Sequence, residues 1–418
     1  MEVTFLKKCL GVNLKFSDGA VQLDQINVIE EIMEDYKIYI DRLDEVSSTE
    51  LPEHIKTVRN YLKKMNFNRR SKDIPLSVDR VFDIDEDAPK SQEEINLMKT
   101  ITYRSLLARI AQVWTRRDLK FPVHLVSKYQ QNPGIVNFVD LLRILVHMYD
   151  NRNEVVLVYR KTVEQAKLIG WTDASWASDI NNSRSQTAGV LQYGQMTFQV
   201  IAKQQALITR SSCESEWVAA HEVARNLEYF MSILHFMGRD HIQDFYLLTD
   251  SQSSIDMSSN LVGAKKRSRH FRLRLHDIRQ MLSDKVLKFK YVNTKHQLAD
   301  FYSKLLPAPA YKSFRDQIMG LKDLTVEQTR AYCHEDKSTV EDMSKHHTNF
   351  VCALNGEAIN ACENGFENCS LRQSKSGVIL DDSSLYLEHF DICCGIIDIV
   401  EDNVVSGTVN LLDGDGQL

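Results

Sequence analysis

Short apolar stretches of strand length follow one another through the middle of the chain, separated by turn residues and by one long stretch with helical spacing. These stretches cover residues 166–173, 189–198, 206–209, 247–249 and 287–292. The second of them predicts a hairpin that turns at Tyr193-Gly194-Gln195, and a long helix is predicted to start after Ser211. The resulting order, β-β-β-α-β-α-β-α, predicts a mixed sheet flanked by helices.

The first 160 residues have mainly helical spacing. A hairpin is predicted at the start, because residues 9–16 alternate and residues 20–23 return after the turn signal Ser17-Asp18-Gly19. Helices are predicted over residues 24–36, from Tyr103 onward and over residues 139–147, and a strand over residues 154–159. Residues 40–90 are charged and irregular, and their pattern assigns no element.

Four carboxylates stand at the ends of the predicted elements. Asp173 and Asp250 end two strands, Asp300 opens a helix after a third strand, and Glu216 lies near the start of the long helix. Acids make up 57 of the 418 residues, so any single one is by default a solvated surface charge. Four acids on element ends can instead converge on two divalent cations, since Mg²⁺ takes carboxylate oxygens and a metal pair clamps the attacking and leaving oxygens of a phosphodiester.

Two glutamates compete for the place on the long helix. Glu214 stands three residues after Ser211, which is the spacing of a capping box and gives Glu214 a structural role. Glu216 directly precedes Trp217 and a run of small apolar residues. Glu216 is therefore the predicted ligand.

Five short motifs carry a resemblance to a known family. They are Thr172-Asp173-Ala174-Ser175-Trp176-Ala177, Ser183-Arg184-Ser185 with Thr187-Ala188-Gly189, Ser211-Ser212-Cys213-Glu214-Ser215-Glu216-Trp217, Thr249-Asp250-Ser251 and Gln297-Leu298-Ala299-Asp300-Phe301-Tyr302-Ser303-Lys304. In order and approximate spacing they resemble the ribonuclease H domain of copia-type LTR retrotransposon Pol polyproteins. That family also places its catalytic glutamate directly before an aromatic residue, as Glu216 is here.

The resemblance implies a fold and a division of the chain. Residues 165–307 would form an α/β (α+β) ribonuclease H-like domain, a mixed sheet flanked by helices. Residues 1–160 would be a mostly helical, partial reverse transcriptase thumb/connection region, and residues 308–418 an acidic extension without an assigned role.

The resemblance also implies an activity. The domain would hydrolyse the RNA strand of RNA–DNA hybrids during reverse transcription, using two Mg²⁺ ions, or Mn²⁺ in their place. Its catalytic and metal-binding residues would be Asp173, Glu216, Asp250 and Asp300. Its partners would be the hybrid and the remaining Pol segments, namely the polymerase palm and the integrase, and it would not bind a membrane. It would be located in the cytoplasm, within a virus-like particle, and in the nucleus.

The N-terminal region resembles the stretch that follows the polymerase palm in the same polyproteins. Trp114-Thr115-Arg116-Arg117-Asp118 matches a family motif in which Arg117 takes the place of a proline. We find no Tyr-x-Asp-Asp-type hairpin, so the chain is expected to be a C-terminal piece of Pol without polymerase activity. The alternative is a truncated or decayed retroelement remnant that keeps the fold and nucleic-acid binding without catalysis.

Charge is unevenly distributed. Residues 333–418 hold sixteen acids and four Lys or Arg, a net charge of −12, whereas the whole chain has −6, so residues 1–332 carry +6. A basic body with an acidic tail suits a nucleic-acid enzyme with an appendage. The eight cysteines are too loosely spaced for a disulfide framework or a zinc module, no secretory signal opens the chain, and no apolar run approaches the roughly 20 residues that span a membrane.

One basic run and one histidine are further candidates. The run comprises Lys265, Lys266, Arg267, Arg269, Arg272 and Arg274. Such a run is ordinarily a solvated face, but beside a nuclease site it predicts a groove that follows the phosphate backbone. His296 is ordinarily a solvated loop histidine, and the resemblance offers it a second role, because a loop histidine helps product leave in many ribonucleases H.

Overall fold

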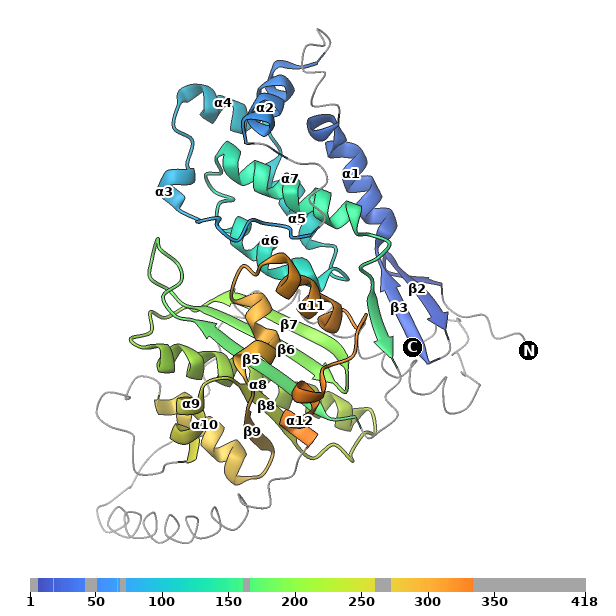
Figure 1. Cartoon of the computed structure of the whole chain (residues 1–418), viewed down its shortest axis with the longest axis vertical. Coiled ribbons are helices and arrows are strands. Elements are labelled where there is room, and N and C mark those ends of the chain that lie inside the picture. Colours follow the sequence, from blue (N-terminus) through green and yellow to red (C-terminus); the bar gives the residue numbers. More distant parts are fainter. Residues whose placement is uncertain are drawn as a thin grey trace, which may run out of the picture.

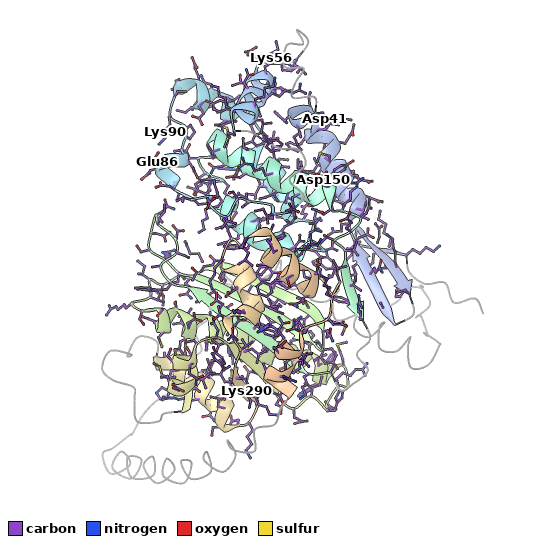
Figure 2. All side chains as sticks on the ribbon, viewed as in Figure 1. Asp41, Lys56, Glu86, Lys90, Asp150 and Lys290 are labelled. Carbon is purple, nitrogen blue, oxygen red and sulfur yellow. The ribbon has the colours of Figure 1, made fainter. Side chains whose placement is uncertain are left out.

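The computed structural model describes residues 7–17, 19–41, 51–65, 67, 73–160, 166–259 and 272–333. Within these residues a helical region, a four-stranded sheet and a five-stranded sheet lie against one another (Figure 1). In Figure 1 the helical region stands above the five-stranded sheet, and helix α11 (Ala308–Ile318) lies between them. Charged side chains such as Lys56, Glu86 and Lys90 lie on the outer surface of the helical region (Figure 2).

The helical region is built around α7, whose residues are apolar on nearly all sides. The helices are α1 (Ile26–Ile40), α2 (Glu53–Lys64), α3 (Ile84–Asp87), α4 (Gln92–Thr100), α5 (Tyr103–Ala111), α6 (Lys120–Ser127) and α7 (Ile135–Asp150). A helix that is apolar all round is stable only when other elements surround it, and α7 contacts α1, α2, α5 and α6. The helices predicted over residues 24–36 and 139–147 are confirmed, and residues 40–90, where the pattern assigned nothing, contain α2 and α3.

The predicted N-terminal hairpin is confirmed and belongs to the four-stranded antiparallel sheet. Its strands are β1 (Lys8–Cys9), β2 (Val12–Ser17), β3 (Ala20–Asp24) and β4 (Leu157–Arg160). The turn between β2 and β3 contains Gly19 at a φ of +71°, a conformation that suits glycine. The strand predicted over residues 154–159 is confirmed as β4, which pairs with β3 from far along the chain.

The five-stranded sheet is mixed, as predicted, and has the order β7-β6-β5-β8-β9. Its strands are β5 (Leu168–Ser175), β6 (Gln186–Tyr193), β7 (Met196–Gln204), β8 (Phe245–Thr249) and β9 (Leu287–Tyr291). Strands β5, β6 and β7 pair antiparallel, whereas β8 pairs parallel with β5 and with β9. The hairpin turn predicted at Gly194 is confirmed between β6 and β7, with φ at +60°.

The strand predicted over Ala206 to Thr209 is wrong. The third strand of the sheet is β7, and the chain leaves the sheet after it. Gln205 anchors this exit, since its Nε2 donates to Thr187 Oγ1 and to the Ser215 carbonyl, both at 3.0 Å. The two apolar residues that suggested a strand, Leu207 and Ile208, are 56% and 62% exposed.

Successive side chains of a strand point to opposite faces of the sheet. Both faces of the five-stranded sheet are buried, because helices cover each of them. Helix α8 (Ser212–Phe236) covers one face, where Leu168 and Leu247 pack against it, and η5 (Leu298–Tyr302) and α11 cover the other, where Trp171 and Leu248 lie. The side of α8 comes close to the sheet at Gly170. A Cβ there would lie 2.6 Å from side-chain atoms of Leu227 and Val223.

Buried polar contacts join the helical region to the sheet. The Arg117 guanidinium donates to Tyr159 on β4 and to the Thr197 carbonyl on β7, and its own carbonyl accepts from Tyr302 at 3.1 Å. Arg117, which stands where the family motif has proline, thus connects three elements. The division of the chain at residues 160, 165 and 307 stays a prediction.

The elements beyond residue 307 pack onto this body. The hydroxyl of Tyr311 on α11 donates to Asp118 at 3.4 Å, and α12 (Val326–Cys333) contacts β9. Among the residues that the structure describes, no helix combines the length and the apolarity needed to cross a membrane.

Candidate metal centre

Asp173 and Asp250 are brought to the same height by the register of two parallel strands. Trp171 on β5 pairs with Leu248 on β8, so Asp173 and Asp250 each lie two residues further along neighbouring strands. Glu216, in the first turns of α8, faces them across the end of the sheet. One ligand oxygen from each of the three carboxylates lies within 4.8 Å of the others. Three such carboxylates can hold a hard divalent cation.

The start of α8 fixes the position of Glu216. The Ser211 side chain accepts a hydrogen bond from the Glu214 backbone N–H at 3.1 Å, and the Glu214 carboxylate accepts one from the Arg210 backbone N–H at 2.8 Å. Trp217 is fully buried on the sheet side of the helix. Capping and the buried indole together set the rotation of the helix, which aims Glu216 at the other two carboxylates.

Glu216 is half-buried and lies beside two other carboxylates, which disfavours its charged form. Burial, and after it the charge of Asp173, raises the pKa of Glu216 from 4.5 to about 9. One oxygen of Glu216, Oε2, is buried without a hydrogen-bond partner. An unpartnered buried carboxylate oxygen beside two other carboxylates is the arrangement that a cation would relieve.

Asp300 lies in η5 beside this trio but is not part of the close cluster. Burial, then the charge of Asp173, raises the pKa of Asp300 to about 7. Lys304 lies between the two: its Nζ is 2.9 Å from Asp300 Oδ1 and 3.6 Å from Asp173 Oδ2. The structure therefore brings together three of the four predicted carboxylates directly and the fourth through a lysine.

Neighbouring hydroxyls orient the carboxylates. The Ser303 hydroxyl donates to Asp173 Oδ2, and the Thr294 hydroxyl donates to Asp250 Oδ2 at 2.7 Å. Sequence reasoning gave no role to Ser303, Thr294 or Lys304. Ser303 and Lys304 follow Asp300 within the last of the five motifs, and this adjacency was the available signal. Thr294 carried none, because it reaches Asp250 only through the packing of β8 against β9.

A buried amide locks the two strands beneath the carboxylates. Gln297 is fully buried, and its Nε2 donates to the Thr172 carbonyl at 3.0 Å and to the Leu248 carbonyl at 3.5 Å. One carbonyl belongs to the residue just before Asp173 on β5, and the other to the residue two before Asp250, near the end of β8. Gln297 thus holds the two strand ends in register, and with them Asp173 and Asp250.

The motif residues after Asp173 shape the rim of the site. The backbone N–H of Ala177 donates to Ser185 Oγ at 3.1 Å, and Ser185 Oγ shares a 2.7 Å hydrogen bond with Thr209 Oγ1. Trp176 is half exposed, and its indole N–H donates to the Thr209 carbonyl at 3.2 Å. The loop after β5 is therefore tied to the segment that leads into α8.

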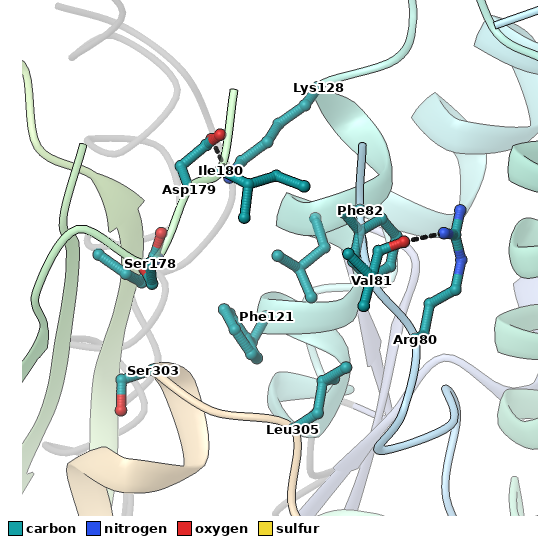
Figure 3. Close-up of a pocket in the computed structure, with 12 residues that line it drawn as sticks. Arg80, Val81, Phe82, Phe121, Lys128, Ser178, Asp179, Ile180, Ser303 and Leu305 are labelled. Carbon is teal, nitrogen blue, oxygen red and sulfur yellow. Dashed lines mark hydrogen bonds and ion pairs between the residues drawn. The ribbon is translucent and has the colours of Figure 1, made fainter. Parts of the chain in front are cut away.

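A pocket of ≈ 290 Å³ opens beside the centre, between the sheet and the helical region (Figure 3). Ser303 lines one end, and the aromatic rings of Phe82 and Phe121 line its inner part. Lys128 donates to Asp179 at 2.9 Å across its rim. Arg80, which also lines the pocket, pairs with Asp87 and Asp140, so both cations have carboxylate partners and the pocket does not add a basic surface to the site.

The remaining predicted residues are only partly described. Lys265, Lys266, Arg267 and Arg269 lie outside the described residues, and so does the side chain of Arg272. Arg274 lies on α10 (Arg272–Ser283) and lines a separate, shallow pocket with His221 and Asp277, whose side chains are 2.8 Å apart. His296 ends the short helix η4 (Thr294–His296), is half-buried, and its carbonyl accepts from Gln328 at 3.1 Å.

This chain is similar to segments of retrotransposon polyproteins. It is 28% identical over 232 residues to the retrovirus-related Pol polyprotein from transposon TNT 1-94 of Nicotiana tabacum, a match that covers 55% of the chain and 17% of the polyprotein. It is 24% identical over 319 residues to the transposon Ty1-NL2 Gag-Pol polyprotein of Saccharomyces cerevisiae, covering 74% of the chain and 17% of that polyprotein. The chain thus spans less than a fifth of either relative.

No family model matches the chain. Among solved structures, the chain is similar to the N-terminal RNase H domain of a Mycobacterium tuberculosis protein fused to maltose binding protein, with 13% identity, a TM-score of 0.25, and coverage of 36% of this chain and 96% of that one.

Proposed function

Since this chain is related to a segment of copia/Ty1-type retrotransposon Pol polyproteins, we propose that residues 165–307 form a ribonuclease H-like domain that cleaves the RNA strand of RNA–DNA hybrids. The observation that carries the proposal is the convergence of Asp173, Glu216 and Asp250 within 4.8 Å at one end of the mixed sheet. The observed order of elements supports it: β5-β6-β7-α8-β8 is followed by two helices, α9 (Gln252–Ser259) and α10, where one was predicted, and then by β9 and α11. The helical region before it would be the thumb/connection part of the polyprotein.

The donor set fits a divalent cation. Hard ions such as Mg²⁺ take carboxylate oxygens, and the unpartnered Oε2 of Glu216 offers one beside Asp173 and Asp250. These three residues would hold a first ion, and Asp173 with Asp300 would contribute to a second. Bound there, the ions would supply an activated water and stabilise the leaving 3′ oxygen of the RNA.

The chain's own residues prepare this chemistry. The Ser303 hydroxyl donates to one oxygen of Asp173 and the Thr294 hydroxyl to one oxygen of Asp250, which restrains the rotation of both carboxylates. Gln297 fixes the strand ends and so the spacing between the two aspartates. Because these contacts exist before any ligand arrives, the carboxylates need little rearrangement to bind an ion, which is the purpose of a preorganised site.

The proposed substrate has one RNA and one DNA strand. The 2′-hydroxyl groups of RNA distinguish it from DNA, so selectivity would come from contacts to these hydroxyls near Asp173. The basic run of Lys265, Lys266 and Arg267 would add contacts to phosphates, which carry affinity without sequence information. The other proposed partners are the remaining Pol segments, the polymerase palm and the integrase.

Cleavage of a labelled RNA–DNA hybrid by the full chain with Mg²⁺ tests the proposal. We expect the RNA strand to be cut, with no cleavage of a DNA duplex and none in EDTA. Asp173→Asn should abolish cleavage and preserve hybrid binding, because it keeps the shape and removes one ligand charge. Glu222→Gln, on α8 where Glu222 pairs with Lys203 of the edge strand β7, is the matched control and should cut normally.

One result would refute the proposal in favour of the remnant alternative. A folded wild-type chain that binds the hybrid but leaves both strands intact in Mg²⁺ and in Mn²⁺ is a binding module. Folding is checked independently by thermal unfolding of the same preparation.

A further inference from the structure

Lys304 is the cation nearest to the metal centre among the residues that the structure describes. It directly follows Ser303, whose hydroxyl donates to Asp173. The turn that ends η5 places it there, because the backbone N–H of Lys304 donates to the Asp300 carbonyl at 3.2 Å. Its ammonium points back over the acids rather than into solvent.

The ammonium lies against two carboxylates at once. Its Nζ is 2.9 Å from Asp300 Oδ1 and 3.6 Å from Asp173 Oδ2, and the side chains of these aspartates are only 10% and 4% exposed. Asp173 belongs to the cluster of three, whereas Asp300 stands outside it. A positive charge that bridges Asp173 and Asp300 occupies the space where an ion shared by these two residues would bind.

The ammonium can leave this space without disturbing the fold. The Lys304 side chain is 42% exposed, so its flexible stem can swing toward solvent while the aspartates stay buried. The cluster of Asp173, Glu216 and Asp250 does not depend on Lys304 for its geometry, since strands β5 and β8 and helix α8 fix it. The two halves of the centre therefore differ, because one is open to a cation and the other already holds one.

We propose that Lys304 is a positioning residue that occupies the second ion position in the metal-free protein and competes with a divalent cation for Asp173 and Asp300. The inference rests on the two-ion site of the proposed function. It gives that site an order of filling: the first ion binds to Asp173, Glu216 and Asp250, and the second binds only by displacing the ammonium. Lys304 thereby makes the second ion the weaker one.

Calorimetric titration of the metal-free full chain with Mn²⁺ tests this without measuring activity. In the wild type we expect two classes of site. Lys304→Met keeps the length and packing of the stem and removes the charge, so the weaker site should bind about tenfold more tightly, a change of about 1.4 kcal/mol. Lys304→Arg keeps a positive charge and should leave the weaker site weak.

A second lysine serves as the matched control. Lys288 is 38% exposed and pairs with Asp244 at 2.6 Å, at the opposite end of β8 from Asp250, so Lys288→Met removes a comparable ion pair without touching the centre. It should leave both Mn²⁺ affinities unchanged. Thermal unfolding in EDTA verifies that every variant is folded before titration.

The outcomes separate this inference from the proposed function. If the wild type binds two Mn²⁺ ions and Lys304→Met binds both with wild-type affinities, Lys304 does not compete and the inference is refuted while the two-ion site stands. If the Asp173→Asn variant binds as much Mn²⁺ as the wild type, or neither binds any, the proposed metal site is refuted and this inference with it. If Lys304→Met tightens both sites equally, the lysine acts as a distant charge, which also refutes displacement.

Discussion

The replacement Glu216→Gln should stabilise the metal-free protein at alkaline pH. Burial and the charge of Asp173 raise the pKa of Glu216 in the folded protein to about 9, against 4.5 in its ordinary state. The folded protein therefore binds this proton more tightly than the unfolded chain does. Below about pH 4.5 the carboxyl is neutral in both the folded and the unfolded protein, and its burial costs no stability. As the pH rises toward about 9, the unfolded chain loses this proton more readily, and the free energy of unfolding falls. Glutamine is neutral throughout and has the same shape.

The size of the effect follows from the shift in pKa. Each unit of difference is worth about 1.4 kcal/mol, so at pH 8 the shift corresponds to at most about 5 kcal/mol. Glu216 is partly accessible to water, which screens the charge and reduces the expected gain to about 3 kcal/mol. For a protein of this size, this gain raises the Tm by roughly 3–5 °C.

Thermal unfolding of the wild type and of Glu216→Gln in EDTA, from pH 5 to pH 9, measures this gain. The two Tm curves should nearly coincide at pH 5 and separate progressively toward pH 8. Glu222→Gln, on the same helix but paired with Lys203, should follow the wild type at every pH. Parallel curves for Glu216→Gln and wild type would mean that Glu216 is not held in a buried, negatively charged cluster. Added Mg²⁺ should stabilise the wild type and leave Glu216→Gln nearly unchanged.

Three shorter predictions concern the same centre and its supports. The pKa of Asp300 is raised to about 7 and that of Glu216 to about 9, so Mg²⁺ must displace protons when it binds. The Kd for Mg²⁺ in calorimetric titrations should therefore fall by up to about tenfold per pH unit between about pH 6 and pH 9. A Kd that does not change with pH contradicts this. Glu214→Gln weakens the cap at the start of α8, so it should lower the free energy of unfolding by about 1 kcal/mol or less while hybrid cleavage continues. If Glu214→Gln abolishes cleavage and Glu216→Gln does not, Glu214 is the metal ligand and Glu216 is not. Gly170→Ala places a Cβ 2.6 Å from Leu227 and should cost about 1–3 kcal/mol in chemical denaturation, whereas an unchanged midpoint shows that α8 can move away.

Much of the fold follows from local patterns in the sequence. The apolar runs that end at Asp173 and Asp250 have the length and composition of buried strands, and both form strands because such runs gain most when both faces are covered. Ser211 followed by Glu214 predicts the start of α8, since capping involves only neighbouring residues. These signals suffice to select Glu216 over Glu214 as the residue directed at the aspartates.

One local signal was misleading. Leu207 and Ile208 have strand-forming side chains, yet they are exposed in the segment between β7 and α8. The chain must cross there from the edge strand of the sheet to the helix, and the hydrogen bonds of Gln205 to Thr187 and Ser215 fix that path. Intrinsic strand propensity is weak, and these long-range contacts override it.

The sequence by itself determined the strands that carry Asp173 and lead to Asp250 and the start of α8, and with them the element ends near which these carboxylates stand. Only the tertiary structure decided which of those ends meet. The pairing of Trp171 with Leu248 puts Asp173 level with Asp250, the packing of α8 brings in Glu216, and Asp300 stays one lysine away. Thr294 and Lys304 acquire their contacts to the site in the same step. Their contacts join residues far apart in the chain, and no pattern within a short window records such distances, because register and packing are set by the burial of the whole core.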